Sequence, residues 1–335
     1  MLSRLQLVGG ESYSDRQAIE FKTDDDEKLH RFIYNRLPKN GTMLAETARH
    51  HFATPGKMLR AKMALHAAKI LKIDHAAALH WAVAIEVLHN ASLIHDDMCD
   101  NDVLRRGRPS VWSKYGRNVA LTLGDWLVAL AFELAAEAAQ RAQTPLLVKI
   151  LAQHMATTTA GEASELSLDR ALDWDSYVEI AADKTAPLLT APLEGVAAMA
   201  LHVDASSSVG SYFRSLGTAY QIANDIMNFR ALDGAFDKAS DLARRAPNAV
   251  VVLYRHKLSQ ERSREFDEWY ASGSNAKLGS WQQAILSSHA LALSAYEMQK
   301  YLNQTARFAK EMPVSLSEAV LPVQSLLRQV CLKSI

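Results

Sequence analysis

Residues 95–110 read HDDMCDNDVLRRGRPS, and this short segment gathers the side chains best suited to chemistry. Asp96 and Asp100 are four residues apart, so on a helix both carboxylates lie on one face. Hard cations such as Mg2+ bind one or two carboxylates together with phosphate oxygens. Arg105 and Arg106 follow at once, and a guanidinium group binds phosphate through paired hydrogen bonds. A self-neutralising exposed loop would use the same residue types, but carboxylates beside arginines favour a diphosphate held through metal ions.

Two long apolar segments must position these side chains. Residues 79–95, LHWAVAIEVLHNASLIH, are mostly apolar and predict a largely buried helix that ends at the acids. The segment 211–229, SYFRSLGTAYQIANDIMNF, ends on Asn224, Asp225 and Asn228, which repeat the spacing of the first group. An ordinary polar helix end would also have this composition. Two such helices facing one another would line a cavity with metal-binding groups at its mouth and apolar side chains below.

The charge balance and the cysteine count limit the classes of function. Among 335 residues, 37 Lys and Arg balance 37 Asp and Glu, so the chain has no overall basic field for nucleic acid. The two cysteines, Cys99 and Cys331, predict a reducing setting rather than a disulfide framework. The N-terminus lacks a signal-peptide pattern, and no run of about 18 apolar residues predicts a membrane span. We therefore expect a soluble, cytoplasmic protein.

Helix-forming residues dominate nearly the whole chain, and clusters of β-branched residues are few. The segment VVVLY at 250–254 would suit a strand, but its helical flanks favour a buried helix. A further long helix is expected over 279–303. Because no composition shift marks a linker, residues 26–335 are predicted to form one all-α domain, a helical bundle around a central apolar cavity. Residues 1–25 are expected to be an irregular N-terminal segment.

Several segments between about residue 42 and residue 255 resemble the trans-isoprenyl diphosphate synthases, which couple an allylic diphosphate to isopentenyl diphosphate. GKMLRAKM at 56–63 is similar to the family's GKRxRP segment, and DDMCD at 96–100 is similar to its first aspartate-rich motif. ADKTAPLL at 182–189 contains a pair that resembles the family's KT, Tyr220–Gln221 resembles its FQ, and residues 240–242 resemble its SDL segment. Each match alone is weak, but their joint order and spacing are highly specific.

The resemblance implies a role for each matching residue. The implied catalytic side chains are Asp96, Asp97, Asp100 and Lys184, and the implied metal ligands are Asp96, Asp100, Asn224 and Asp225. The implied substrate-binding side chains are Lys57, Arg60, His89, Arg105, Arg106, Thr185, Tyr220, Gln221 and Lys238. Within this set, the isopentenyl diphosphate site corresponds to Lys57, Arg60, His89 and Arg106. The resemblance also implies Mg2+ as cofactor, the two diphosphates as partners and a homodimer as the assembly.

The second motif departs from the family's DDxxD, because Asn224 and Asn228 stand where two aspartates are usual. An amide oxygen carries no charge, so it should bind Mg2+ more weakly. The departure leaves open a weakly active or non-catalytic partner subunit of a prenyl synthase, or a relative with an unusual acceptor. A class I terpene cyclase is disfavoured, because Asn228 and Leu232 occupy the Ser/Thr and Glu places of its motif.

The size of the product should depend on the residues one helical turn before Asp96. Ala91 and Ser92 stand there, whereas short-chain family members carry a bulky aromatic floor. These small side chains favour a product of C20 or longer. The predicted reaction is therefore a Mg2+-dependent condensation that gives a longer trans-prenyl diphosphate.

Overall fold

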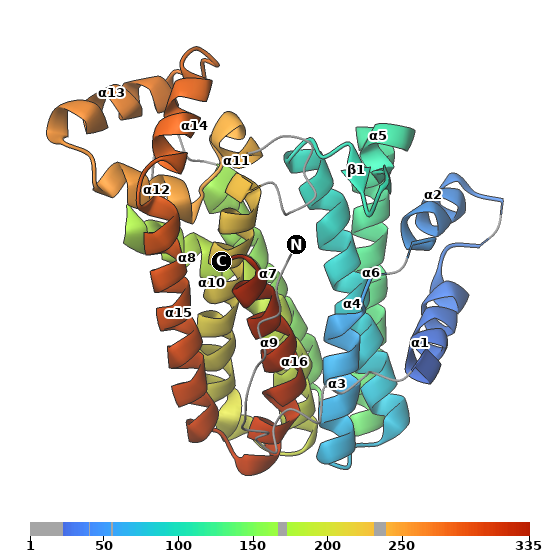
Figure 1. Cartoon of the computed structure of the whole chain (residues 1–335). Helices are drawn as coiled ribbons and strands as arrows, with labels where there is room; N and C mark the ends of the chain where they lie inside the picture. The colour runs from blue at the N-terminus through green and yellow to red at the C-terminus, as the bar shows by residue number, and fades with distance from the viewer. Residues whose placement is uncertain (1–22, 40, 55, 167–172, 231–238) are drawn as a thin grey trace, which may run out of the picture.

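The computed structural model describes residues 23–39, 41–54, 56–166, 173–230 and 239–335, and within these ranges nearly every regular element is a helix (Figure 1). The α-helices are α1 (Thr23–Arg36), α2 (Met43–Phe52), α3 (Leu59–Ile70), α4 (His75–Cys99), α5 (Val111–Tyr115), α6 (Arg117–Ala142), α7 (Leu146–Leu166), α8 (Trp174–Thr185), α9 (Pro187–Met199), α10 (Ser206–Arg230), α11 (Ser240–Arg244), α12 (Ala249–His256), α13 (Gln260–Ala271), α14 (Leu278–Leu286), α15 (Ala290–Phe308) and α16 (Val314–Lys333). Two 3-10 turns, η1 (Val203–Ala205) and η2 (Ala309–Glu311), and two strands, β1 (Leu104–Arg105) and β2 (Arg108–Pro109), complete them. The predicted all-α fold class is confirmed.

The two acid-bearing segments lie on two central helices of this bundle, α4 and α10. α4 packs against α6, α3 and α9, whereas α10 packs against α15, α8, α9 and α16. Trp81 and Ile85 of α4 are fully buried, as are Tyr212 and Phe213 of α10. In Figure 1, α11 and the β1–β2 hairpin lie at the same end of the bundle, the end at which α4 terminates. The fold therefore gathers the polar motifs at one end, above an apolar interior.

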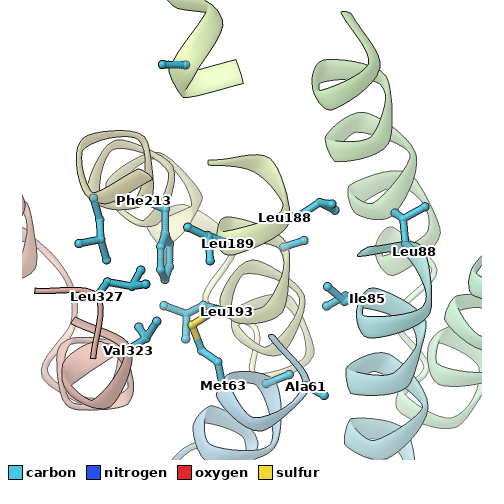
Figure 2. Packing of buried hydrophobic residues seen from close by; sticks show 14 of the residues in the cluster. Ala61, Met63, Ile85, Leu88, Leu188, Leu189, Leu193, Phe213, Val323 and Leu327 are labelled. Carbon is cyan, nitrogen blue, oxygen red and sulfur yellow. The ribbon is translucent and has the colours of Figure 1, made fainter. Parts of the chain in front are cut away.

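Apolar side chains from several helices fill the interior below this end. In Figure 2, Ile85 of α4 and Leu188 of α9 face the space between those two helices. Farther from the acids along α4, the Trp81 indole Nε1 donates to the carbonyl of Pro192 over 3.3 Å. Gly195 permits this approach, because a Cβ at that position would be 2.1 Å from the indole. α4 and α9 are thus in direct contact at the level of Trp81.

Two segments in the C-terminal part of the chain, 250–254 and 279–303, were expected to be helical. Helix α12 covers 250–254, so VVVLY is helical as predicted. The single helix expected over 279–303 was wrong, because α14 and α15 are separate helices there. Ser288 explains the break: its hydroxyl donates to the carbonyl of Ile285 and accepts from the backbone N–H of Ala290.

The start of the first helix also differs from the expectation. α1 begins at Thr23, within the segment expected to be irregular, and residues 1–22 lie outside the part of the chain that the structure describes. The short helices α5 and α11 and the β1–β2 hairpin had no counterpart in the prediction. The two helices are five residues long and the two strands two residues long, too short for a periodic pattern of apolar residues to reveal.

Two helices in the described chain are long and apolar enough to cross a membrane when judged by length and composition alone. They are α4 and α6, which pack against each other within the bundle. The apolar window of α4 is 78% buried, as expected for a core helix, whereas that of α6 is only 44% buried. α6 therefore has an outer face that the described chain does not cover.

Candidate active site

Helix α4 ends in the acids of the first motif, and the structure gives them different surroundings. Asp96 is half-buried, and burial together with the charge of Glu162 raises its pKa to about 7. No described basic side chain is within ion-pair distance of Asp96. Asp100 caps the helix, with its backbone N–H donating to the carbonyl of Asp96. A carboxyl group with a raised pKa and no paired cation is a site that a bound cation would stabilise.

Lys184, at the end of α8, lies near enough for its charge to lower the pKa of Asp96, and we call the polar end of the bundle that holds Asp96, Asp100 and Lys184 the mouth. Its Nζ lies 2.7 Å from a carboxylate oxygen of Glu162 and 2.5 Å from one of Glu165, both on α7. Burial disfavours the charged ammonium group, but these two carboxylates raise the pKa of Lys184 above its ordinary range. Gly161 lets α7 approach α8 this closely, because a Cβ there would be 2.9 Å from the backbone nitrogen of Lys184. Lys184 is therefore a permanent cation at the mouth.

The β1–β2 hairpin separates the two arginines of the RRG segment. Arg106 and Gly107 form its tip with φ angles of 53° and 73°, a pair of left-handed residues that suits a tight two-residue turn. Arg105, before the tip, donates through Nε and Nη2 to Asp97 Oδ1, with the Nε bond at 2.8 Å. Asp97 is almost fully buried. Its carboxylate therefore orients Arg105, whereas Asp96 and Asp100 remain at the mouth.

A group of half-buried basic side chains lies about two helical turns below Asp96. His89 of α4 is neutral at pH 7, because burial and then the charges of Arg60 and Arg106 lower its pKa well below the usual value. Arg60, at the start of α3, has a buried Nε without a hydrogen-bond partner, and its nearest balancing charge is the buried Glu86. A half-buried guanidinium group that is incompletely paired favours binding of an anion.

Arg106 belongs to this basic group, and its position explains a glycine of the GKMLR segment. The Arg106 guanidinium donates to the carbonyl of Thr54 over 2.8 Å. It also lies against Gly56, where a Cβ would be 2.7 Å from Nη2. Lys57, the next residue, is exposed, and the structure does not bring its ammonium group into contact with the others.

A pocket that opens to solvent lies beside Arg106, and sequence reasoning did not anticipate most of its wall. The lining is strongly basic and comprises His50, His51, Thr54, Arg105, Arg106, Arg108, Pro109, Ser110 and Val111. The His51 ring shares a 2.9 Å hydrogen bond with Asn90, and burial lowers its pKa to about 4. The arginines thus supply the fixed charge of this pocket, which suits a phosphate group.

The acid of the second motif is enclosed rather than presented at the mouth. Asp225 is buried, and its carboxyl group accepts hydrogen bonds from the hydroxyl of Tyr177 and the backbone N–H of Ala249, each at 2.7 Å. The side-chain amide of Gln221 donates to the other oxygen over 3.1 Å. Burial and then the charge of Asp241 raise the pKa of Asp225 to about 8 despite these bonds. Every oxygen of this side chain is therefore already in use.

The remaining predicted residues of α8 and α10 are polar, and two of them are in contact. The Thr185 hydroxyl lies 3.4 Å from the amide oxygen of Gln221, so the KT and YQ pairs meet. Tyr220 lies near enough to Arg60 to favour its charge. Asn224 is half-buried one turn before Asn228, whose amide donates to the Ser240 hydroxyl over 2.8 Å. Asn228 thus joins the end of α10 to the start of α11.

Arg244 of α11 is the most informative residue that the sequence did not single out. Its Nη1 lies 3.3 Å from the Asp100 carboxylate and donates to the Asp100 carbonyl over 3.1 Å. Its Nη2 lies 3.0 Å from Asp241, and Asp102 is within 3.8 Å of Nη1. The guanidinium group therefore connects the end of α4 with the α10–α11 side of the mouth.

Among the described residues, the acids on the α4 side of the mouth suit a divalent cation, and the acid of α10 does not. In the described chain, no three His, Cys, Asp or Glu side chains converge in a metal-binding arrangement. Mg2+ does not need such a cage, because it retains water and binds one or two carboxylates plus substrate phosphates. Asp96 and Asp100 fit this requirement, whereas Asp225 does not in the observed arrangement. Lys238, predicted to bind substrate, lies outside the described residues.

Comparison with known proteins identifies the class. The chain matches the sequence model of the polyprenyl synthetase family over residues 41–287. It is 29% identical over 294 residues to the geranylgeranyl diphosphate synthase of Saccharolobus solfataricus, covering 84% of this chain and 88% of that protein. It is 30% identical over 251 residues to component 2 of the heptaprenyl diphosphate synthase of Geobacillus stearothermophilus, covering 72% of this chain and 75% of that protein.

The fold agrees with these matches. A crystal structure of a polyprenyl synthase from Caulobacter crescentus CB15, complexed with calcium and isoprenyl diphosphate, aligns with a TM-score of 0.80 at 25% identity. The alignment covers 94% of this chain and 96% of that one. The chain therefore belongs to the polyprenyl synthetase family, as its motifs predicted. It is an enzyme of the trans-prenyltransferase class, a prenyl diphosphate synthase.

Proposed function

We propose that this protein condenses an allylic diphosphate with isopentenyl diphosphate, in a Mg2+-dependent reaction, to form a trans-prenyl diphosphate of C20 or longer. The observation that carries the proposal is the placement of two opposite charge environments along α4. Asp96 and Asp100 lie at its end, where the charge of Lys184 acts on Asp96, and the half-buried cations Arg60 and Arg106 act on His89 two turns below. One diphosphate would bind at each environment, which brings two reacting chains side by side.

The allylic diphosphate is assigned to the upper environment. When bound to Asp96 and Asp100, Mg2+ would neutralise the charge that grows on the departing diphosphate. Lys184 adds a fixed positive charge there, because Glu162 and Glu165 hold its ammonium group in place and keep it protonated. Arg105, oriented by Asp97, is assigned as a second cation for the same group, because its charge also acts on Asp96. Lys238 is assigned to this diphosphate as well.

Isopentenyl diphosphate is assigned to the basic group below. Arg60 and Arg106 supply the charge, with Lys57 at the rim, and the neutral His89 supplies hydrogen bonding rather than a third positive charge. The carbon–oxygen bond of the allylic diphosphate breaks to leave an allylic cation. The isopentenyl double bond attacks this cation to form the new carbon–carbon bond, and a proton then leaves the adjacent carbon, with the released diphosphate as its acceptor.

The apolar interior protects the cation and sets the length of the product. Water is kept out by the side chains between α4 and α9, including Ile85 and Leu188 (Figure 2). Ser92 lies on the same face of α4 as Asp96, one turn below, and is small enough to let a growing chain pass. Trp81, in contact with α9, is then the side chain that ends the path. The distance between Ser92 and Trp81 supports a product beyond C15.

The decisive experiment is a product assay. Purified protein is incubated with Mg2+, isopentenyl diphosphate and C5, C10 or C15 allylic diphosphate, and the products are sized. We expect elongation to C20 or longer that stops when EDTA is added. Release of diphosphate without isopentenyl incorporation would identify a cyclase, and no reaction with any allylic substrate would identify a non-catalytic subunit. Each of these results rejects the proposal.

We also propose a cytoplasmic homodimer that buries the outer face of α6. Leu121, Val128 and Phe132 share one side of this helix, and Leu121 is 49% exposed. An uncovered apolar stripe on a long helix favours association with a second copy. Light scattering should give twice the chain mass, and Leu121→Asp should shift the protein toward the monomer. A monomeric wild-type protein would refute this assembly. The two cysteines are free thiols, which suits a reducing compartment.

A further inference from the structure

The end of α10 and the adjoining α11 show a pattern of charge that the proposed reaction does not require. Of the three positions in the second motif that carry acids in the family, only Asp225 is an acid here, and its oxygens are used by Tyr177, Gln221 and Ala249. Asn228 is engaged with Ser240, and its oxygen accepts from the backbone N–H of Asp241 over 3.4 Å. This side of the mouth therefore offers no free carboxylate in the motif itself.

The carboxylates that do reach this side of the mouth already share a cation. Asp100 and Asp241 contact opposite nitrogens of the Arg244 guanidinium at 3.3 and 3.0 Å, and Asp102 lies within 3.8 Å. Asp241 is further held by the amide of Asn248 at 3.0 Å. Burial disfavours the charge on Arg244, but Asp100 and Asp241 raise its pKa, so the guanidinium group is always charged. A planar group with donors on both edges connects two carboxylates in a way that Lys cannot.

We propose that Arg244 is a resident cation that takes the place of a divalent metal ion between the α4 end and the α10–α11 side of the mouth. The charge on Arg244 then explains why Asn224 and Asn228 are neutral. Because a protein cation already joins Asp100 to Asp241, additional carboxylates on α10 would have no metal ion to bind. Arg244 is a positioning residue, which holds Asp100 in place for the proposed reaction. The inference rests on the proposed function only in assigning a divalent cation to Asp96 and Asp100.

The test measures metal binding directly, without turnover. Mn2+ prefers the same hard oxygen ligands as Mg2+, and its binding can be counted by electron paramagnetic resonance in the absence of substrate. Arg244→Gln leaves Asp100, Asp102 and Asp241 without their shared cation, so this variant should bind about one more Mn2+ per chain than the wild type. Arg244→Lys retains the charge and should bind the wild-type number. Arg255→Gln is the matched control, because it removes another Arg–carboxylate pair, with Asp267, from the surface.

Thermal unfolding gives a second readout. Without metal, Arg244→Gln brings three uncompensated carboxylates together and should unfold at a lower temperature than the wild type. Saturating Mg2+ should raise its midpoint by about 2–4 °C more than it raises the midpoint of the wild type or of Arg255→Gln. A variant that stays unfolded even with Mg2+, or one with an unchanged Mn2+ count, shows that a metal ion cannot replace Arg244, and either result overturns the proposal.

The outcome is separable from that of the proposed function. If the wild type forms no prenyl diphosphate but Arg244→Gln gains a Mn2+ ion, the reaction assignment fails and the role of Arg244 stands. If the wild type is active and the Mn2+ count of Arg244→Gln does not change, the reaction assignment stands and the proposed role of Arg244 fails.

Discussion

The acids at the end of α4 have different partners, and these partners predict how much each acid matters. Arg105 holds Asp97 and Arg244 holds Asp100, whereas no described cation pairs with Asp96. Asp96→Asn should therefore lower kcat by about 100-fold or more, because it removes the carboxylate best placed to hold the metal ion. The measurement is a steady-state assay over a range of Mg2+ concentrations. Asp175→Asn, at an exposed acid in the first turn of α8, should retain full activity. Substantial activity in Asp96→Asn would refute the metal assignment.

The two arginines of the hairpin should differ in their kinetic effects, because Arg105 is paired with Asp97 of the first motif whereas Arg106 donates to Thr54. Arg106→Ala removes a charge from the basic group around His89 and should raise KM for isopentenyl diphosphate by about 10- to 100-fold. KM for the allylic substrate should change little. Arg105→Ala should instead raise KM for the allylic substrate and change KM for isopentenyl diphosphate little. Varying each substrate separately tests the pair, and equal effects on both KM values would mean that the two diphosphate sites are not distinct.

At the scale of single residues, the sequence indicated spacing along one helix but not contacts between distant segments. Spacing on a helix correctly indicated that Asp96 and Asp100 lie together at the end of α4, because that relation depends on local geometry. The pairing of Asp97 with Arg105 depends on a two-residue turn between short strands. The position of Arg244 depends on the whole fold, since 144 residues separate it from Asp100. No local pattern encodes such a contact.

At the scale of elements, the junction of α10 with α12 contains a buried carboxyl group that should make stability depend on pH. The pKa of Asp225 is about 8 in the folded protein, against an ordinary value of 3.8. Between these values the folded chain keeps a proton that the unfolded chain has lost, so the free energy of unfolding should fall as pH rises from about 4 to about 8. Asp225→Asn should flatten this decline. Urea unfolding at pH 5, 6.5 and 8 in EDTA tests the expectation, and equal pH dependence in both proteins would contradict it.

The long helices were predictable and their junctions were not. α4 and α10 contain extended apolar faces, and burial of such faces is the main source of helix stability in a bundle. The break between α14 and α15 occurs at Ser287–Ser288–His289, which lacks Gly and Pro, and is stabilised by hydrogen bonds of one serine side chain. α11 is five residues long, and the Asn228 side chain holds it by bonding to the Ser240 hydroxyl and the backbone N–H of Asp241. Elements of this kind form because the surrounding bundle supports them.

At the scale of the whole molecule, α4 joins the chemistry to the length of the product. The same helix presents Asp96 at the mouth, Ser92 one turn below and Trp81 in contact with α9. Each residue adds about 1.5 Å along a helix, so the fifteen residues from Trp81 to Asp96 span about 22 Å. In the proposed reaction the growing chain would follow this direction between α4 and α9, which pack against each other. Side chains on the facing sides of the two helices would then determine the length of the product.

Ser92 is the position on α4 at which a change of side chain should alter the length of the product. Ser92→Phe places a ring one turn below Asp96, where it should block the growing chain before it reaches Ile85 and Trp81. The main product should shorten to about C15, because the ring closes the proposed path toward the apolar interior. Ser92→Ala is the matched control, since it removes the hydroxyl without adding bulk and should leave the product unchanged. Product sizing with the C10 allylic substrate makes the comparison, and an unchanged product from Ser92→Phe would show that the chain grows along a different path.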